Sequence, residues 1–358
     1  MRPTVLEVDI NKFNKNIENI QKYVGNKKIM PVIKANAYGT YINKKLEIIN
    51  KFDIVAIAIV DEAIELRKLG YKKEIFLLNQ PSLEEIEDII NYDVTIGLSD
   101  DKFLDELSSI NNNIKVHLEI ETGMNRTGIK LNKLLNFIEK VKENKNIIVE
   151  GIYTHLSSAD YDENYTKQQL EIFNKAVKIA KEKINTIKYI HSSASNGLIN
   201  YEDNVSNLVR PGIIMYGYES FEKLNEKLAV EPICKLKTKI TFLKELDEGE
   251  SVSYSRKFIS KNKMKVATIP IGYVDGLRRE LFNKGKVIVN NKLVPIIGNV
   301  CMDSCMIDVT NIENVEVGTE VYIWDNKNIT LEDIANECNT INYEILSTVS
   351  YRVPRKFI

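Results

Sequence analysis

The sequence contains little cysteine and histidine, and this scarcity limits the kinds of site that it can build. Its 358 residues include 4 cysteines and 3 histidines, too few for a disulfide framework or a histidine-rich zinc centre. Cys301 and Cys305 lie in an alternating, strand-like segment, where reduced core cysteines are favoured over a metal or redox pair. We therefore expect no metal site.

Excess charge of one sign and long hydrophobic runs are missing as well. The 49 Lys and Arg nearly balance the 50 Asp and Glu, which argues against a dedicated binder of nucleic acid or of membrane surfaces. No apolar run approaches the ~20 residues of a membrane-spanning helix, and residues 1–9 lack the pattern of a signal peptide. We expect a soluble, cytoplasmic protein, and its length predicts two domains.

The first half of the chain repeats a short apolar run followed by an amphipathic, helix-like stretch. Eight such runs occur, at residues 30–33, 54–57, 75–78, 94–96, 114–118, 147–149, 187–190 and 213–215. Runs that are apolar at consecutive positions are typical of parallel strands buried on both faces. The pattern predicts a (β/α)8 barrel of the TIM type over residues 1–228.

The second half changes to a period of two, as in residues 236–242 and 286–289, with turn pairs between the runs. This alternation predicts an antiparallel β domain over residues 229–358, with a short helix near Leu331–Cys338. The first few residues of the chain could pair with that domain. No flexible linker separates the halves, so we expect them to pack together.

Functional residues of such barrels gather where the strands end. Lys34 follows the first apolar run, where poor solvation would lower its pKa and leave the amine free to attack an aldehyde. The alternative is a lysine that merely reaches water from a strand end. After the fifth run, Arg126 could bind a carboxylate, held by Glu119 or Glu121, or it could form an ordinary surface salt bridge.

The later strands add polar groups that suit an anion. His155 and His191 end the sixth and seventh runs, although a lone histidine there is more often structural. Ser195 opens a predicted helix and could hold a phosphate. Gly212 allows close approach of backbone to an anion, and Arg210 would point into the barrel mouth. Together with Lys34, these groups indicate a site for pyridoxal 5′-phosphate (PLP).

Seven ordered segments carry a resemblance to a known family. They are Val32–Gly39, Glu121–Gly128, Val209–Gly217, Val252–Tyr254, Gly272–Gly276, Cys301–Asp303 and Tyr351–Arg355. In these segments, and over essentially its whole length, the chain resembles the alanine racemases, PLP enzymes with an N-terminal (β/α)8 barrel and a C-terminal β domain. The resemblance implies that L-alanine and D-alanine are interconverted by two bases, and that D-alanine serves peptidoglycan synthesis.

The resemblance also implies roles for single residues. Lys34 would hold PLP covalently and exchange the Cα proton on one face, and Tyr254 from the second subunit of a head-to-tail homodimer would act on the other. Arg210 would face the pyridine nitrogen and keep it unprotonated, which favours racemisation over transamination. His155 would orient Arg210.

The remaining implied roles concern phosphate, substrate and the surroundings of the site. The phosphate ligands would be Tyr38, Ser195, Gly212, Ile213 and Tyr351. Arg126 and Met302 would contact the substrate, with Tyr273 from the partner subunit at the entry. The supporting residues would be Glu119, His191 and Asp303.

The chain departs from the family at three places. Many members carry a carbamylated lysine where this chain has Glu119, so we expect Glu119 to anchor Arg126 directly, although it could instead face water. Gly39–Tyr41 replaces the usual Gly-His-Gly, which affects the first barrel loop. Ala194 replaces an asparagine beside the expected phosphate site.

Other functions remain open from the sequence. Fold-related PLP decarboxylases would be expected to present a cysteine in an acid-rich C-terminal motif, where this chain has Tyr254 and Met302. Single-barrel PLP carriers end with the barrel, whereas this chain continues. Met302 and Tyr351 should crowd the site and favour alanine, but an apolar pocket discriminates against an added hydroxyl by only about 10²-fold. A serine or broader-specificity racemase is therefore an alternative.

Overall fold

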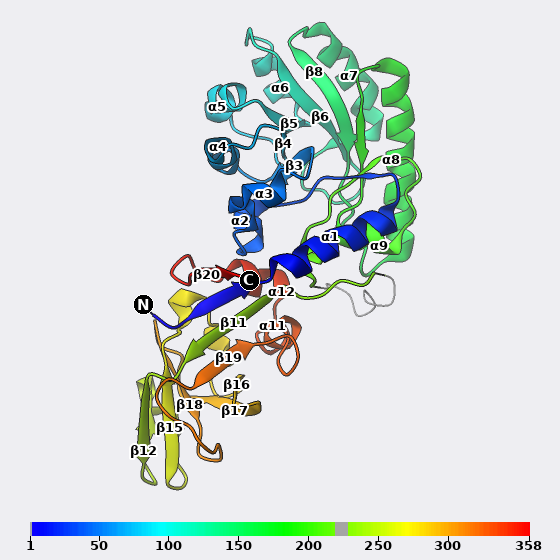
Figure 1. Ribbon diagram of the computed structural model, residues 1–358. Helices are drawn as coiled ribbons and strands as arrows, with labels where there is room; N and C mark the ends of the chain where they lie inside the picture. Colours follow the sequence, from blue (N-terminus) through cyan, green and yellow to red (C-terminus); the bar gives the residue numbers. More distant parts are fainter. Residues whose placement is uncertain (1, 219–227) are drawn as a thin grey trace.

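The chain folds into two halves that lie end to end, with both chain ends near their boundary (Figure 1). The structure, a computed structural model, describes residues 2–218 and 228–358. The upper half in Figure 1 is a barrel of strands and helices, and the lower half consists mostly of strands. Among the described residues, no helix is long and apolar enough to cross a membrane.

Eight parallel strands form the barrel. They are β2 (Lys28–Ile29), β3 (Ile54–Ile57), β4 (Glu74–Leu77), β5 (Val94–Leu98), β6 (Ile114–Glu121), β8 (Ile147–Tyr153), β9 (Tyr189–His191) and β10 (Leu208–Val209). Strands β3 to β9 make one continuous sheet, to which the short β7 (Ile129–Lys130) adds at the end of β6, and β2 pairs with β10. A bridge from Val32 to Ala56 closes one seam, and the Arg210 N–H donates to the Ser193 carbonyl (2.9 Å) across the other. The predicted fold class is confirmed.

Helices surround the barrel strands. They are α1 (Ile10–Val24), α3 (Leu46–Ile49), α4 (Val60–Leu69), α5 (Ile86–Asn91), α6 (Asp101–Leu107), α7 (Leu134–Glu143) and α8 (Glu163–Lys183), while the short α2 (Lys34–Tyr38) and α9 (Ser195–Asn200) lie at the barrel mouth. Helix α8 begins where the Asp162 carboxylate accepts from the Tyr165 N–H (2.9 Å). It buries Leu170, Phe173 and Val177, the apolar stripe that its sequence predicts.

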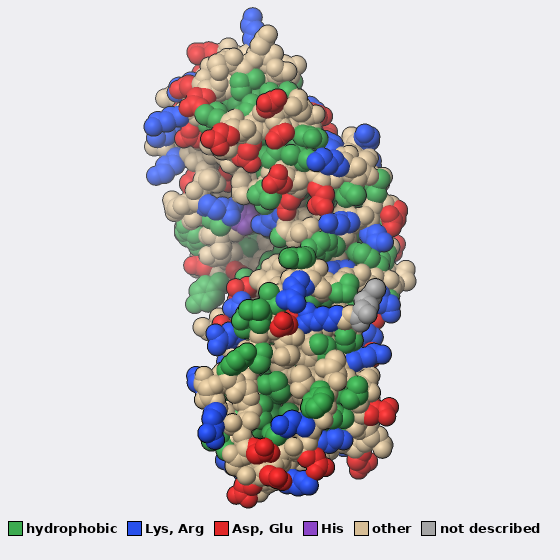
Figure 2. Space-filling view, turned by 90° about the vertical axis from the view of Figure 1, so that its left-hand side faces the viewer, with side chains coloured by type: hydrophobic (Ala, Val, Ile, Leu, Met, Phe, Trp, Pro, Cys, Tyr) green, Lys and Arg blue, Asp and Glu red, His purple; other side chains and the backbone are tan. Residues whose placement is uncertain are grey.

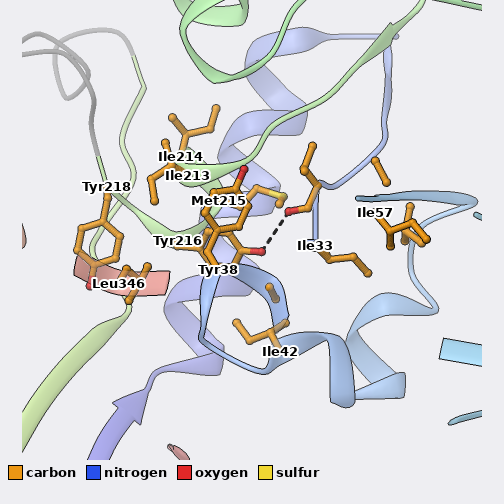
Figure 3. Close-up of a cluster of buried hydrophobic side chains, with 14 of the residues drawn as sticks. Ile33, Tyr38, Ile42, Ile57, Ile213, Ile214, Met215, Tyr216, Tyr218 and Leu346 are labelled. Carbon is orange, nitrogen blue, oxygen red and sulfur yellow. Dashed lines mark hydrogen bonds between the residues drawn. The ribbon is translucent and has the colours of Figure 1, made fainter. Parts of the chain in front are cut away.

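Two predicted strands differ from the structure. The first run, residues 30–33, follows β2 and contains only the Val32 bridge. The run at residues 213–215 is not a strand but the 3₁₀ helix η4 (Ile213–Tyr216), and the eighth strand is β10, which precedes it. The Pro211 carbonyl still accepts from the Val32 N–H (3.0 Å), and the extended conformation ends at Gly212, which has a ψ of −103°. The run is apolar because it is buried under the barrel mouth, where Ile213, Met215 and Tyr216 pack against Tyr38 (Figure 3).

The second half is built on a nine-stranded sheet with α11 (Leu331–Glu337) and α12 (Asn342–Ser347) beside it. Its strands, in spatial order, are β12 (Phe242–Leu246), β15 (Met264–Ile269), β18 (Cys305–Asp308), β17 (Lys292–Ile297), β16 (Lys286–Val289), β19 (Glu320–Trp324), β11 (Cys234–Lys239), β1 (Val5–Val8) and β20 (Arg355–Phe357). A separate hairpin pairs β13 (Ser251–Val252) with β14 (Phe258–Ile259). The alternation of apolar and polar residues along β11 matches the burial of its side chains, since Cys234, Leu236 and Thr238 are buried whereas Lys235 and Lys239 are exposed.

The first strand of the chain belongs to this second sheet. Strand β1 pairs antiparallel with β11 and parallel with β20. The N-terminal strand therefore belongs to the second half, the β half, although the residues that follow it form the barrel. The Arg2 guanidinium donates to both carboxylate oxygens of the buried Asp275 (2.5 and 2.6 Å), which is a second connection between the N-terminal segment and the β half. The predicted boundary at residue 228 adjoins residues 219–227, which lie outside the described residues.

The junction between the halves yields a stability prediction. We expect Gly217→Ala to lower the free energy of unfolding by about 2–5 kcal/mol. Gly217 has a φ of +78°, and an added Cβ would lie 1.9 Å from the carbonyl oxygen of Glu231. Gly249 has a φ of +85° with no atom within 4 Å of an added Cβ, so Gly249→Ala is the control for the backbone effect alone. Equal losses of both variants in urea unfolding would contradict the prediction.

Candidate active site

A cavity of about 310 Å³ opens where the barrel strands end. It is lined by seven residues that the sequence singles out: Lys34, Tyr38, Arg126, His155, Ser195, Arg210 and Gly212. Figure 2 shows a histidine between lysine or arginine side chains in a recessed part of this face. The cavity thus joins an amine, two guanidinium groups, an imidazole and two hydroxyls.

Lys34 stands at the start of an unusual turn. Ala35 to Tyr38 all have φ between +52° and +56°, so α2 is one turn of left-handed helix. The Ala37 N–H donates to the Ile33 carbonyl and the Gly39 N–H to the Ala35 carbonyl, both at 2.8 Å. A left-handed conformation costs roughly 1–2 kcal/mol per residue. The surroundings must therefore hold this turn in place.

The environment of Lys34 favours a neutral amine. Burial lowers the pKa of Lys34, the positive charge of Arg126 lowers it further, and Glu62 acts in the opposite direction. A larger share of the lysine is then unprotonated near neutral pH than in water, which suits a nucleophile or a base.

Arg210 is the most connected group of the site and is only 2% exposed. Its guanidinium donates to the carbonyl oxygens of Thr154 (2.8 Å), His191 (2.9 Å) and Ser192 (2.9 Å). It also donates to Nδ1 of His191 at 2.7 Å, and Nδ1 of His155 lies 3.4 Å from it. Burial lowers the pKa of Arg210 to about 10, so it stays charged at neutral pH.

The neighbouring histidines are neutral. Burial, followed by the charge of Arg210, lowers the pKa of His155 to about 3 and that of His191 well below its usual value. Because His191 accepts at Nδ1, its proton sits on Nε2, which donates to Nδ1 of His117 (2.9 Å). The sequence analysis expected His155 to orient Arg210, but the shorter contact belongs to His191.

Hydroxyl and backbone groups converge at the end of the cavity formed by Ser195, Gly212 and Tyr38. The Gly212 N–H donates to Ser195 Oγ (3.0 Å), and an added Cβ at Gly212 would lie 2.5 Å from Tyr38 Oη. Burial raises the pKa of Tyr38, so its phenol stays protonated and can donate to an anion. Its ring packs on Tyr216 at 5.2 Å between centroids (Figure 3). This end of the cavity suits a phosphate.

Eight of the predicted residues do not line this cavity. Three of them, Glu119, His191 and Ile213, belong to the barrel, and the other five lie on the β half. Tyr254 is 70% exposed, Tyr273 42%, Met302 53% and Tyr351 83%, and Asp303 is also exposed. Ile213 adjoins Gly212, but its side chain is buried in the core (Figure 3).

Glu119 does not bind Arg126 in the way the sequence predicts. Its carboxylate accepts from the Thr127 hydroxyl (2.8 Å), and it is only 4% exposed, so the alternative that it faces water is also wrong. Among residues 2–218 and 228–358, no carboxylate lies within ion-pair distance of Arg126. The arginine is exposed on the loop after β6, whereas Glu119 is buried beside Thr127 and Tyr153, so Glu119 and Arg126 interact only at longer range.

Several groups at the cavity are not among the residues predicted from the sequence. Tyr153 ends β8 and Asn79 follows β4, and both line the cavity, so the rule that strand ends carry function could have found them. Tyr343 reaches the cavity from α12 of the other half, and its ring lies 6.0 Å from that of Tyr38. Nothing in the local sequence around Tyr343 signals this contact.

Known proteins share this architecture. Residues 8–220 match the alanine racemase N-terminal domain and residues 233–357 match the alanine racemase C-terminal domain. The chain belongs to the alanine racemase family. Alanine racemase 2 of Caldanaerobacter subterraneus subsp. tengcongensis is 40% identical, over 100% of this chain and 95% of that protein.

Solved structures of family members are close in fold. The alanine racemase of Clostridium difficile 630 superposes with a TM-score of 0.93 at 31% identity, covering 100% of this chain and 96% of that one. The alanine racemase of Bacillus anthracis with bound L-Ala-P has a TM-score of 0.92 at 30% identity, covering 100% of this chain and 95% of that one.

The burial of Glu119 yields a prediction about pH. Burial raises the pKa of Glu119, with the Thr127 hydrogen bond opposing it. The folded protein then binds a proton more tightly than the unfolded chain, so the stability that Glu119 contributes is full below its unfolded pKa and is lost as pH rises through the folded pKa. Between pH 5 and pH 8, wild type should therefore lose more unfolding free energy than Glu119→Gln does. The exposed Glu84→Gln is the control, and identical pH profiles of wild type and Glu119→Gln would contradict the assignment.

Proposed function

We propose that this chain binds PLP in the 310 Å³ cavity and interconverts L-alanine and D-alanine by a two-base mechanism. The observation that carries the proposal is the convergence of the Lys34 amine, the buried Arg210 and the Ser195–Gly212 cradle in one cavity. Membership of the alanine racemase family supports the same reaction.

The residues present fit the cofactor. Lys34 would hold the aldehyde carbon, Arg210 would face the pyridine nitrogen, and Tyr38, Ser195 and the Gly212 region would hold the phosphate. An added Cβ at Gly212 would obstruct the cradle, which is consistent with close approach of an anion to the backbone there. When bound, PLP withdraws electrons from the substrate and so acidifies its Cα–H bond.

Each residue then has a task in moving one proton. Lys34, whose pKa is lowered by burial, removes or returns the Cα proton on one face. Arg210 keeps its charge and would disfavour a second cation at the pyridine nitrogen, which would limit delocalisation into the ring and favour rapid return of the proton to Cα. Arg126 is suited to the substrate carboxylate because it lines the cavity and is free of any ion pair among the described residues.

The second base would come from another subunit. Tyr254 lies at the start of η5 (Tyr254–Arg256), where Ser253 and Ser255 have positive φ and the tyrosine projects into solvent. Together with Tyr273, Met302 and Tyr351, it forms an exposed set on the β half that would complete the cavity of a partner in a head-to-tail homodimer. Cytoplasmic action and the use of D-alanine in peptidoglycan are further parts of this proposal, based on the family resemblance.

The proposed function predicts that the PLP-saturated protein forms D-alanine from L-alanine. Lys34→Ala and Tyr254→Phe should each lower kcat by at least about 10²-fold, since general acid–base groups contribute 10²- to 10⁴-fold. A chiral assay with L-alanine and, in parallel, L-serine measures activity and specificity together. Bound PLP without racemisation of either amino acid would favour a decarboxylase or a PLP carrier.

Mixing the two inactive variants tests where Tyr254 acts. If Lys34 and Tyr254 of different subunits share a site, a mixed dimer regains one intact site, and subunit exchange should restore activity. Each variant mixed with itself is the control. Activity that stays absent although mixed dimers form would place both residues in one subunit.

Because Glu119 stands where many family members carry a carbamylated lysine, we expect the activity of this chain not to depend on carbon dioxide. A glutamate cannot be carbamylated, so activity should be equal in degassed and in bicarbonate-supplemented buffer. Glu119→Lys restores a side chain that can react and should become sensitive to bicarbonate. Wild-type activity that falls on degassing and recovers with carbon dioxide would contradict the prediction.

A further inference from the structure

Glu62 links the turn that carries Lys34 to the next barrel helix. It occupies the third position of α4, and its Oε2 accepts from the N–H groups of Ala58 (2.8 Å) and Ile59 (3.4 Å). Its Oε1 accepts from the Ala35 N–H at 2.5 Å, although Ala35 lies 27 residues earlier in the sequence. One carboxylate therefore joins α4 to the residue that directly follows Lys34.

Helix capping accounts for only part of this arrangement. A glutamate at the third helical position commonly accepts from the backbone N–H at the start of its own helix, as Oε2 does here. The contact of Oε1 with Ala35 lies outside that motif, since it reaches a different β–α unit. It satisfies a backbone N–H at the first left-handed residue of the turn.

The turn needs such support because its conformation is costly. Ala35, Asn36, Ala37 and Tyr38 all have positive φ, and none of them is a glycine. At its far end, Arg355 Nε donates to the Gly39 carbonyl (2.8 Å). At its near end, next to the lysine, the side chain that holds the turn is that of Glu62.

We propose that Glu62 is a positioning residue for Lys34, which fixes the direction in which the lysine enters the cavity and supplies a negative charge that acts on its amine. The inference rests on the proposed function, because it takes Lys34 as the residue that binds PLP. Glu62 itself does not line the cavity and so acts through Lys34.

The charges around Lys34 agree with this role. The pKa of Lys34 is lowered by burial and by Arg126, and Glu62 is the group that opposes them. His155, which also lines the cavity and interacts electrostatically with Lys34, is neutral. Removal of the Glu62 charge should therefore lower the pKa of Lys34 further, whereas loss of a helix cap alone would leave it unchanged.

The test compares Glu62→Gln with Glu65→Gln in the full-length chain freed of PLP. Glutamine keeps an acceptor for the helix cap but has no charge and only one oxygen, so it cannot hold both segments. Glu65 lies on the same helix, where it pairs with Lys44 at 2.9 Å with its side chain 40% exposed. The readout is the change in absorbance after PLP is added, as the lysine nitrogen bonds to the aldehyde carbon and the oxygen leaves as water.

We expect two separate changes in Glu62→Gln. The limiting rate at high pH, where the amine is neutral in every variant, should fall about ten-fold because the lysine is misdirected. The pH midpoint of the rate should move to lower pH because the anion is gone. Glu65→Gln should match wild type in both respects.

The outcomes separate this inference from the proposed function. Unchanged rate and midpoint in Glu62→Gln would reduce Glu62 to a helix cap and overturn the inference. The proposed function would fail instead if wild type formed no covalent link with PLP, or if the Lys34→Ala variant formed the link as well as wild type does. Glu62→Asp is a second variant that keeps the negative charge on a shorter side chain. Its limiting rate should fall with little change in the pH midpoint. A wild-type limiting rate in Glu62→Asp would overturn the inference.

Discussion

The site depends on a charge that is held out of water. Arg210 is 2% exposed, and taking a guanidinium into the interior costs on the order of several kcal/mol unless its donors are satisfied. Carbonyl oxygens of Thr154, His191 and Ser192 satisfy them, and these residues follow or end β8 and β9. The guanidinium thus connects the ends of the adjacent strands β8 and β9 at the barrel mouth.

Much of this arrangement could be predicted from the sequence because it follows from local pattern. Consecutive apolar residues indicate buried parallel strands, and the rule that strand ends carry function finds Lys34, His155 and Arg210. The run at residues 213–215 defeats that reasoning, since burial in a 3₁₀ helix leaves the same apolar signature as burial in a strand. Periodicity over three residues cannot distinguish the two.

Contacts between segments that are remote in the sequence could not be predicted. Tyr343 reaches the cavity from the β half, and Glu62 reaches Ala35 from the neighbouring β–α unit. The ion pair expected between Glu119 and Arg126, which the family resemblance suggested, fails for the same reason: Glu119 is buried near the end of β6, whereas Arg126 is exposed on the loop that follows. Which neighbour a carboxylate meets is set by tertiary packing.

The histidines behind Arg210 show what the fixed charge requires of its surroundings. The guanidinium can only donate, so His191 must accept, and its other nitrogen must donate to His117. The remaining proton of His117 then lies on Nε2, a buried donor that has no hydrogen-bond partner in the described part of the chain. An unsatisfied buried donor costs about 1–3 kcal/mol. Orienting Arg210 therefore leaves its unsatisfied donor on His117, which stacks on Phe76 in the barrel core. The energetic penalty thus falls on a residue that does not line the cavity.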